Sequence, residues 1–436
     1  MWSRSTGRQA AADFMPVPTR RAVTVGGRKE YWRGLSSLFC FLLWSGPMTN
    51  HTVTSLFSGI GGFEVGFAQA GLTTAFMCEK DPVAQAVIRD RFSHVELFDD
   101  VTKMIQLPRT DVLVGGWPCQ DLSQAGRLAG LEGSQSGLIV DVFRLLDASA
   151  HKPNTILLEN VAFSLNLQKG WAIRYVTGEL EKRGYRWAYR VLDTQRFGLP
   201  HRRRRIFICG MREGDPAGVL FDGLGGCAPS GHDAPADVGF YWTEGNRGVG
   251  WTPNAVPPLK GGSGLSIPSP PAIWTVQTGA FNTPGIEDAE RLQGFEPGWT
   301  EAARDKKNSD RNRWRLVGNA VSVPVAAWLG RRLKESQYST ISYEEHGTKK
   351  SITHNAAWGG PDQSTRYIPD TWEGPSDPVT VSVANFGLQR PSPLSLRAAQ
   401  GFLRRYLRSG LTKNQDFTRA LATYCGLEAL VPDYPL

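Results

Sequence analysis

Short apolar or β-branched runs alternate with stretches of helical periodicity between residues 52 and 212. This alternation predicts a doubly wound α/β sheet with helices packed on both of its faces. The predicted strands are 52–57, 73–78, 111–115, 155–159, 186–193 and 205–209. The predicted helices between them are 63–70, 82–92, 138–150 and 172–183. In such sheets ligands bind at the carboxyl ends of the strands, so the residues that follow each strand are the first candidates for a functional site.

Composition and periodicity divide the whole chain into five parts: 1–47, 48–211, 212–285, 286–335 and 336–436. The first is expected to be a disordered extension or an incorrectly assigned start, because its apolar run is too short to cross a bilayer and begins too late for a signal peptide. The third is rich in Gly, Pro, Ser and Trp, which predicts an irregular smaller domain. Further helices are predicted at 286–293, 321–333, 394–409 and 414–424. The fourth part is expected to return to the domain of the second, and the last is a C-terminal extension of unknown role.

The charge balance favours a polyanionic partner. The 49 Lys and Arg residues outnumber the 41 Asp and Glu residues, so the formal net charge is +8. Moderate basicity of this kind suits nucleic acid, although many other proteins share it. The six cysteines include no Cys-x-x-Cys pair, which argues against a zinc knuckle or a disulfide framework. We therefore expect a cytoplasmic protein with no metal site and no membrane segment.

A glycine-rich turn follows the first predicted strand and contains Gly59 and Gly61. Such a turn lets a ligand approach the backbone and its free amides. Glu64 stands where the dinucleotide-binding pattern GxGxxG needs its third glycine, which counts against a dinucleotide-dependent enzyme. Glu79 and Asp100 follow later strand ends, where carboxylates can accept hydrogen bonds from ribose hydroxyls and an adenine amino group. The pattern fits a nucleoside-bearing cofactor such as S-adenosylmethionine; the alternative is a tight turn flanked by solvated acids.

A cysteine and a glutamate stand at neighbouring strand ends. Cys119 follows the strand 111–115, and Glu159 ends the strand 155–159 at the same edge of the sheet. Taken singly, a cysteine is more often an inert core residue and a strand-end acid more often a cap or an ion-pair partner. Taken together they suit one reaction, because C5 of cytosine becomes nucleophilic only after a thiolate adds to C6 with N3 protonated or hydrogen-bonded.

A basic run, residues 202–205, leads into the strand 205–209. The alternative interpretation is a solvated basic turn, as charge clusters often are. Side chains alternate between the two faces of a strand, so Arg203 and Arg205 are expected to share one face and to point at the cysteine and the base. The remaining arginines of the run can contact phosphates.

Seven motifs occur in one order between residues 52 and 335: FSGIGG, the strand-ending Glu79, PCQ, ENV, GLPHRRRRIF, ERLQGF and VGNAV. In this order they resemble the cytosine-5 DNA methyltransferase family of prokaryotic or phage type. The resemblance implies methyl transfer from S-adenosylmethionine to C5 of a cytosine that is flipped out of the duplex. It implies that Cys119 adds to C6 and that Glu159 holds N3. Arg203 and Arg205 would position the base and stabilise the adduct.

The resemblance also implies a cofactor pocket. Its expected residues are Phe57, Gly59, Gly61, Glu79, Asp100, Val101, Asn319 and Val321. In two places the chain departs from the family, since His201 stands where glutamine is frequent and Arg204 where an acidic residue occurs. Neither departure removes Arg203 or Arg205, but the local hydrogen bonding at these two positions does not follow from the resemblance.

The family's domain plan gives roles to the parts of the chain. Residues 48–211 with 286–335 would be the catalytic and cofactor-binding domain, and 212–285 the target-recognition region. The implied partners are double-stranded DNA and a cognate restriction endonuclease, with the enzyme itself a monomer. One alternative is a tRNA cytosine-5 methyltransferase with the same motifs, although the sizeable insertion before ERLQGF favours a duplex read from its groove. The other is a non-catalytic DNA-binding protein on this scaffold.

Overall fold

The computed structural model describes residues 51–118, 137–224, 226, 237–261, 268–305, 309–335, 354–368 and 371–431. The predicted nucleophile Cys119 and the predicted extension 1–47 lie outside these ranges. The statements below concern the described residues.

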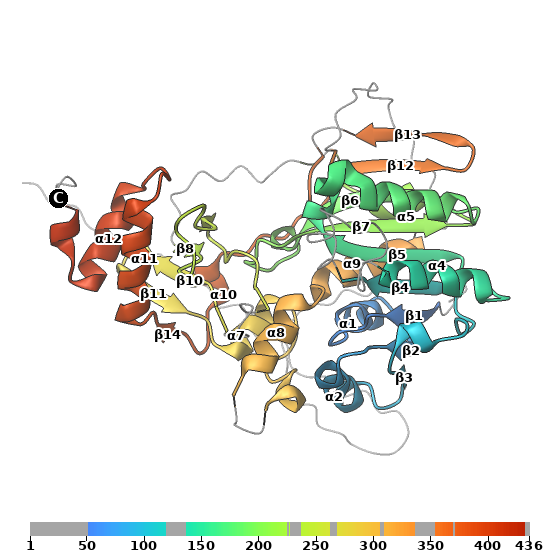
Figure 1. The fold of residues 1–436 in the computed structure, drawn as a ribbon, viewed down its shortest axis with the longest axis horizontal. Coiled ribbons are helices and arrows are strands. Elements are labelled where there is room, and N and C mark those ends of the chain that lie inside the picture. The colour runs from blue at the N-terminus through green and yellow to red at the C-terminus, as the bar shows by residue number, and fades with distance from the viewer. Residues whose placement is uncertain are drawn as a thin grey trace, which may run out of the picture. The chain divides into compact units, whose positions relative to one another are not determined.

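A nine-stranded sheet forms the centre of the described chain, in the order β13-β12-β6-β7-β5-β4-β1-β2-β3 (Figure 1). Its strands are β1 (Thr52–Leu56), β2 (Thr73–Cys78), β3 (Glu96–Phe98), β4 (Val112–Gly116), β5 (Thr155–Val161), β6 (Arg186–Asp193), β7 (Arg204–Met211), β12 (Ala356–Gly360) and β13 (Gln363–Ile368). The first five pair in parallel, whereas β7 runs antiparallel to both β5 and β6. The predicted α/β sheet is confirmed, and the six predicted strands are present in it.

Helices cover both faces of this sheet (Figure 1). Successive side chains of a strand point to opposite faces, so Leu157 of β5 packs on one side while Ile156 and Leu158 pack on the other. On the side of Leu157 lie α1 (Gly62–Gln69), α6 (Pro216–Leu220) and α9 (Val323–Glu335). On the opposite side lie α4 (Leu138–Ala148) and α5 (Trp171–Glu181). Gly66 allows α1 and α9 to approach closely, because a Cβ at this position would lie 2.5 Å from that of Ala326.

A second, antiparallel sheet has the order β14-β11-β10-β8-β9. Its strands are β8 (Asp237–Phe240), β9 (Thr252–Pro253), β10 (Ala272–Thr275), β11 (Ala280–Thr283) and β14 (Ser392–Pro393). Two C-terminal helices, α11 (Leu396–Arg408) and α12 (Gln415–Cys425), share its core, where Phe240 packs against Phe402 and Phe417. The stretch 212–285 therefore contains strands as well as the irregular chain that its composition predicts. These strands are not predicted because two to four residues are too few to show a periodicity in the sequence.

The described residues of the C-terminal part, 354–368 and 371–431, do not form a separate packing unit. β12 pairs with β6 of the main sheet, whereas β14, α11 and α12 belong to the second sheet. Arg190 of β6 helps to fix this part of the chain, because its fully buried guanidinium donates hydrogen bonds to the carbonyl oxygens of Leu220, Asp222, Gly223, Trp372 and Gly374. The Ala- and Gly-rich sequence of β12 has little of the β-branched character that marks a strand, which explains why it is not predicted.

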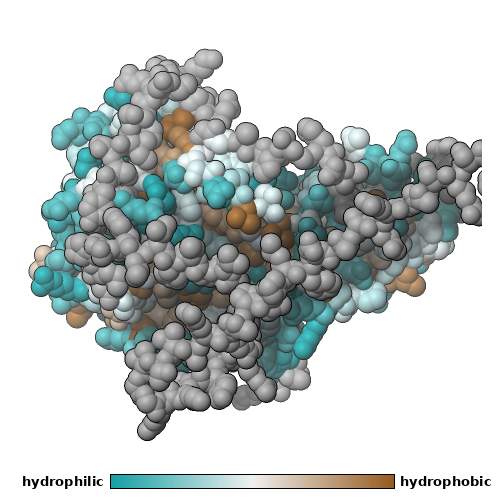
Figure 2. All heavy atoms as spheres, turned by 180° about the vertical axis from the view of Figure 1, so that it is seen from behind, coloured by the Kyte–Doolittle hydropathy of each residue, from teal (hydrophilic) through white to brown (hydrophobic). Residues whose placement is uncertain are grey.

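The remaining helices are α2 (Pro82–Arg91), α7 (Ile286–Leu292), α8 (Arg311–Asn319) and α10 (Val383–Phe386). They pack with α9 and the strand β10 in a further hydrophobic cluster. Hydrophilic side chains make up much of the coloured surface in Figure 2, and hydrophobic ones show mainly in recessed patches. In the described ranges, no helix is both long enough and apolar enough to cross a bilayer.

Candidate active site

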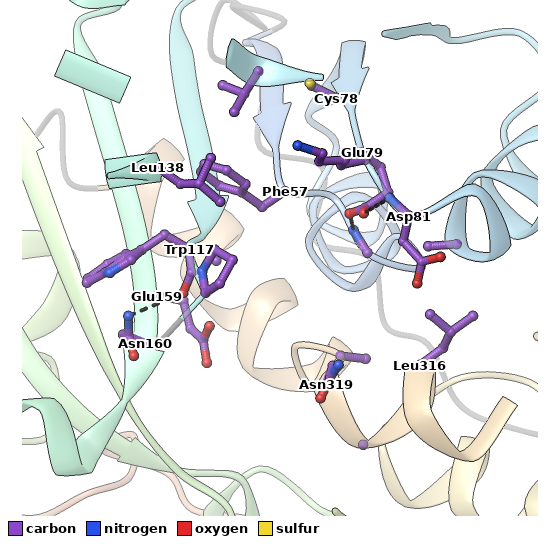
Figure 3. A pocket seen from close by; sticks show the side chains of 18 of the residues that line it. Phe57, Cys78, Glu79, Asp81, Trp117, Leu138, Glu159, Asn160, Leu316 and Asn319 are labelled. Atoms are coloured by element: carbon purple, nitrogen blue, oxygen red, sulfur yellow. Dashed lines mark hydrogen bonds between the residues drawn. The ribbon is translucent and has the colours of Figure 1, made fainter. Parts of the chain in front are cut away.

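A cavity of about 630 Å³ lies where β1, β2, β4 and β5 end, which is the edge that the sheet topology predicts for a ligand (Figure 3). The predicted site residues that line it are Phe57, Gly59, Glu79, Val101, Glu159, Arg203, Arg205 and Asn319. Residues that the sequence analysis did not single out also line it, among them Asp81, Thr102, Trp117, Leu138, Asn160, Arg315 and Leu316. The volume is within the range of sites that enclose a cofactor-sized ligand.

The buried Glu159 and the half-buried Arg205 form an ion pair at this edge. The register of β5 against the antiparallel β7 places Val161 opposite Arg205, and the Arg205 Nε lies 3.0 Å from a carboxylate oxygen of Glu159. On the other side β4 presents Gly116 beside Glu159, and a Cβ on this glycine would lie 3.0 Å from the second carboxylate oxygen. The absence of a side chain at Gly116 thus keeps one oxygen of Glu159 open toward the cavity.

Burial raises the pKa of Glu159 above its ordinary value of 4.5, while the charges of Arg205 and Arg203 act in the opposite direction. A carboxyl group whose pKa is raised keeps its proton to a higher pH than a solvated one. Such a group can donate a hydrogen bond or a proton to a ring nitrogen at a pH where an exposed glutamate would be ionised.

Arg203 is buried, with 2% of its surface exposed, and lies just before β7 begins. It donates hydrogen bonds to the carbonyl oxygen of Ala320 at 2.7 Å and, at 3.5 Å, to that of Leu259. Its Nε has no hydrogen-bond partner among the described residues. Burial lowers the pKa of Arg203 well below its ordinary value, with a further contribution from the neighbouring Arg205. A buried donor without an acceptor costs about 1–3 kcal/mol. Arg203 also lines the cavity, so its guanidinium places a positive charge at the cavity wall.

Asn160 positions the chain segment that leads to Cys119. Its amide nitrogen donates to the carbonyl oxygen of Trp117 at 3.3 Å, and its amide oxygen accepts from the backbone nitrogen of Val161 at 2.8 Å (Figure 3). The described segment 51–118 ends at Pro118, which lines the cavity. The ENV motif contains Asn160, but the sequence alone assigns this residue no role; an amide at the end of a buried strand is the signal that could identify it.

Phe57 and Glu79 lie on another side of the cavity (Figure 3). The carboxylate of Glu79 accepts backbone hydrogen bonds of 2.8 Å from Gly59 and from Asp81. Burial raises the pKa of Glu79, and these two backbone hydrogen bonds oppose the shift. An ionised carboxylate offers about four lone-pair positions, so Glu79 retains acceptors for the hydroxyl groups of a ligand.

Three predicted cofactor residues do not line the cavity. A Cβ on Gly61 would lie 2.3 Å from the ring of Phe92, so this glycine serves the packing of the turn. Asp100 accepts a hydrogen bond from the backbone nitrogen of Thr102 at 3.0 Å and forms an ion pair with Lys80 at 3.2 Å. Val321 packs closely against Gly62, since a Cβ on this glycine would lie 2.4 Å from the carbonyl oxygen of Val321.

Comparison with known proteins decides the family. The sequence profile of the family described as C-5 cytosine-specific DNA methylase matches residues 51–223 of the chain. The Type II methyltransferase M2.BsuMI of Bacillus subtilis (strain 168) is 42% identical over 381 residues, which are 85% of this chain and 97% of that relative. The chain belongs to the C-5 cytosine-specific DNA methylase family. The predicted function, methylation of cytosine C5 in DNA, is thereby confirmed.

Two more distant likenesses concern the sequence and the fold of this methylase. The Type II methyltransferase M.NlaX of Neisseria lactamica is 28% identical over 310 residues, which are 65% of this chain and 96% of that relative. Among solved structures, the S. pombe Dnmt2 methyltransferase has a TM-score of 0.51 at 15% identity, and the match covers 66% of this chain and 100% of that one. The second likeness concerns the fold alone.

The ERLQGF motif of the methylase lies behind the cavity and supports it. Glu290 of this motif pairs with Arg313 at 2.9 Å, and both side chains are fully buried. Gln293 donates to the carbonyl oxygen of Val317 at 2.9 Å. These bonds hold the end of α8, and with it Asn319, at the wall of the cavity. The motif is therefore a scaffold for the site.

His201 joins three segments of the methylase behind Arg203. Its Nε2 accepts a hydrogen bond from the backbone nitrogen of Leu259 at 3.0 Å, so the proton must reside on Nδ1, which lies 3.0 Å from the carbonyl oxygen of Leu292. Burial, together with the charge of Arg203, holds the pKa of His201 well below its ordinary value of 6.5. The position needs one donor and one acceptor, which a glutamine amide also provides.

We therefore expect His201→Gln to stay within about 1 kcal/mol of the wild type, whereas His201→Leu leaves two buried backbone groups unpaired at about 1–3 kcal/mol each. Urea unfolding at pH 7.5 measures the difference. Because the folded histidine is neutral, the wild type should lose stability as the pH falls below about 6.5, where the unfolded chain binds the proton. His201→Gln should lack this loss; an equal acid sensitivity in both proteins would contradict the assignment.

Proposed function

We propose that this methylase transfers the methyl group of S-adenosylmethionine to C5 of a flipped-out cytosine in a specific duplex sequence, with Cys119 as nucleophile. The observation that carries the proposal is the pair of the buried Glu159 with the half-buried Arg205, beside the buried Arg203, at the edge of the sheet where the Pro-Cys-Gln segment begins. These groups present a proton donor and two cations to one small space, which matches the needs of a base that becomes anionic during the reaction.

Each side chain of the site has a separate role in the reaction. The thiolate of Cys119 forms a bond to C6 while Glu159 holds a proton at N3, so the negative charge that would accumulate on the ring is neutralised. Arg205 orients the Glu159 carboxyl, and Arg203, which lines the cavity, binds an exocyclic acceptor of the base. The donor, when bound, supplies an electrophilic methyl group to C5. The C5 proton is then lost to solvent, the electron pair of the bond between C6 and sulfur leaves with the sulfur as the Cys119 thiolate, and the N3 proton returns to Glu159.

The side chains at the other wall of the cavity fit S-adenosylmethionine. Phe57 offers an aromatic face to an adenine ring, Gly59 leaves the backbone accessible, and the carboxylate of Glu79 retains acceptors for ribose hydroxyls. Val101 and Asn319 would border the adenine and the methionine portions, respectively. Gly61, Asp100 and Val321 would act indirectly, since they do not line the cavity.

We expect Phe57→Ala to weaken the binding of S-adenosylhomocysteine by about 3- to 10-fold, because an aromatic stacking contact is worth about 0.5–1.5 kcal/mol. Isothermal titration of the full chain measures the change without reference to activity. Phe163→Ala is the control, since Phe163 is 63% exposed and does not line the cavity. Unchanged affinity in Phe57→Ala would remove Phe57 from the adenine site.

The proposed partners are double-stranded DNA and a cognate restriction endonuclease, in the cytoplasm of a bacterial or phage-infected cell, with the methylase acting as a monomer. The Type II names of the relatives support this setting. Incubation with labelled S-adenosylmethionine and either duplex DNA or tRNA tests the substrate. We expect label at C5 of cytosine in the duplex; label only in tRNA would overturn the proposal. Methylation-sensitive sequencing of plasmid from expressing cells would then identify the target site.

A further inference from the structure

Three arginines form one exposed stripe along α11, here called the α11 stripe: Arg397, Arg404 and Arg408. Their spacing of seven and four residues places them within about 40° of one another around the helix, since each residue advances about 100°. On the opposite side Phe402 and Tyr406 are buried in the core of the second sheet. The packing of α11 therefore fixes the direction in which the stripe faces.

The α11 stripe has no partner in the described structure. No hydrogen bond or ion pair joins its three guanidinium groups to another described residue, whereas Arg304 pairs with Glu301 and Arg332 with Glu335 on other surfaces. From residue 390 to residue 415 the sequence contains no Asp or Glu. The positive potential of the stripe is thus not neutralised by its own segment.

Helix stability does not account for the stripe. Cations are favourable in the last turn of a helix, where Arg408 lies, but unfavourable in the first turn, where Arg397 lies two residues after the cap Ser395. Arg404 and Arg408 are four residues apart, and like charges at this spacing destabilise a helix by about 0.2–0.5 kcal/mol. An external anion would compensate this arrangement.

A short loop connects α11 with the active site. Arg405, which flanks the stripe, donates hydrogen bonds to the carbonyl oxygens of Trp242 and Glu244 at 2.8 and 3.0 Å. This loop begins at Tyr241, whose hydroxyl donates to the carbonyl oxygen of Pro258 at 2.7 Å. The carbonyl oxygen of the next residue, Leu259, accepts from Arg203 of the cavity at 3.5 Å. A continuous set of contacts therefore joins α11, through this loop and the segment Pro258–Leu259, to the wall of the cavity in which the base is proposed to bind.

We propose that the α11 stripe binds the phosphate backbone of the substrate duplex, outside the base pairs that are read for sequence. This inference rests on the proposed function, since it assigns a further contact to the same DNA. The stripe extends over about 16 Å of helix, which corresponds to about five base pairs at 3.4 Å each. Phosphate contacts of this kind fix register and add affinity without adding sequence preference.

The test is the triple variant R397Q/R404Q/R408Q of the full chain. Fluorescence anisotropy measures its binding to a duplex with the mapped target site and to an unrelated duplex of equal length, over a series of salt concentrations. We expect both affinities to fall about 10²- to 10³-fold at 0.1 M salt, and the slope of log K against log salt to become shallower by about 2–3, at about 0.9 per lost phosphate contact. The methylation rate at saturating DNA should stay unchanged.

A matched control removes the same charge elsewhere. The variant R109Q/K152Q/R212Q changes residues at the opposite edge of the main sheet, next to the amino ends of β4 and β5 and the carboxyl end of β7. It should bind both duplexes nearly as the wild type does, and R397K/R404K/R408K should retain most of the binding. Equal losses in the two Gln triple variants, or a loss for the target duplex alone, would overturn the inference. A wild type that binds duplex but methylates none would instead overturn the proposed function.

Discussion

Glu159→Gln should lower the rate of methyl transfer by about 10²- to 10⁴-fold, the usual contribution of a positioned acid or base. The glutamine amide can still donate a hydrogen bond to N3, but it cannot release a proton to it. The pair with Arg205 is lost as well, which leaves that guanidinium without its buried anion. Single-turnover rates on a duplex with the target site measure the effect on the chemical step. The affinity for S-adenosylhomocysteine should change little.

The pH dependence separates this role from a structural one. The reaction needs the protonated carboxyl, and burial raises the pKa of Glu159, so the rate of the wild type should decline only as the pH rises through this elevated value. Glu159→Gln should lack that part of the profile. Glu213→Gln is the control, because Glu213 is exposed just beyond the other end of β7. If Glu159→Gln kept the wild-type pH profile, Glu159 would not be the proton donor.

Glu290→Ala should destabilise the methylase by about 3–5 kcal/mol, because it leaves the fully buried Arg313 without its main counter-charge. Glu290 also accepts backbone hydrogen bonds from Gly298 at 2.6 Å and from Thr300 at 2.9 Å. The substitution therefore removes the pair and leaves two further donors unsatisfied. Denaturant unfolding followed by tryptophan fluorescence measures the loss.

The control variant changes another acidic partner of Arg313, Glu301. Glu301 contacts Arg313 at 3.0 Å, but its side chain is 54% exposed. Exposed pairs contribute about 0–1 kcal/mol, so Glu301→Gln should change the free energy of unfolding by no more than that. If both variants lost the same amount, the buried part of the network would not be what stabilises the wall of the cavity.

The sequence predicts the main sheet well because its strands are long and rich in apolar or β-branched residues. The predicted strand 155–159 contains the run Thr-Ile-Leu-Leu, and β5 extends only two residues beyond its predicted end. The elements that the sequence did not predict have other reasons to form. α8 reads Arg-Asn-Arg-Trp-Arg, a polar sequence whose Arg313 is buried only because Glu290 lies opposite. That pairing depends on residues far apart in the chain and leaves no local signal.

For the site, the motifs bring Glu159, Arg203 and Arg205 to one cavity, as their strand ends predict. Asp100 shows the limit of this reasoning: a carboxylate at the right strand end can bind its own backbone, as Asp100 does with Thr102. Asn160 shows the converse, since its contact with the Trp117 carbonyl depends on the register of two strands. Spacing in the sequence indicates an edge of the sheet, but not which atom each side chain meets.

The central claim is that Cys119 attacks C6 of the target cytosine. The most direct test incubates the full chain with S-adenosylmethionine and a duplex that carries 5-fluorocytosine at the target position, where the fluorine prevents the elimination that would release the enzyme. Mass spectrometry of the digested complex should find the DNA adduct on the peptide that contains Cys119, and Cys119→Ser should form none. An adduct on another cysteine, or one that persists in Cys119→Ser, would contradict the account.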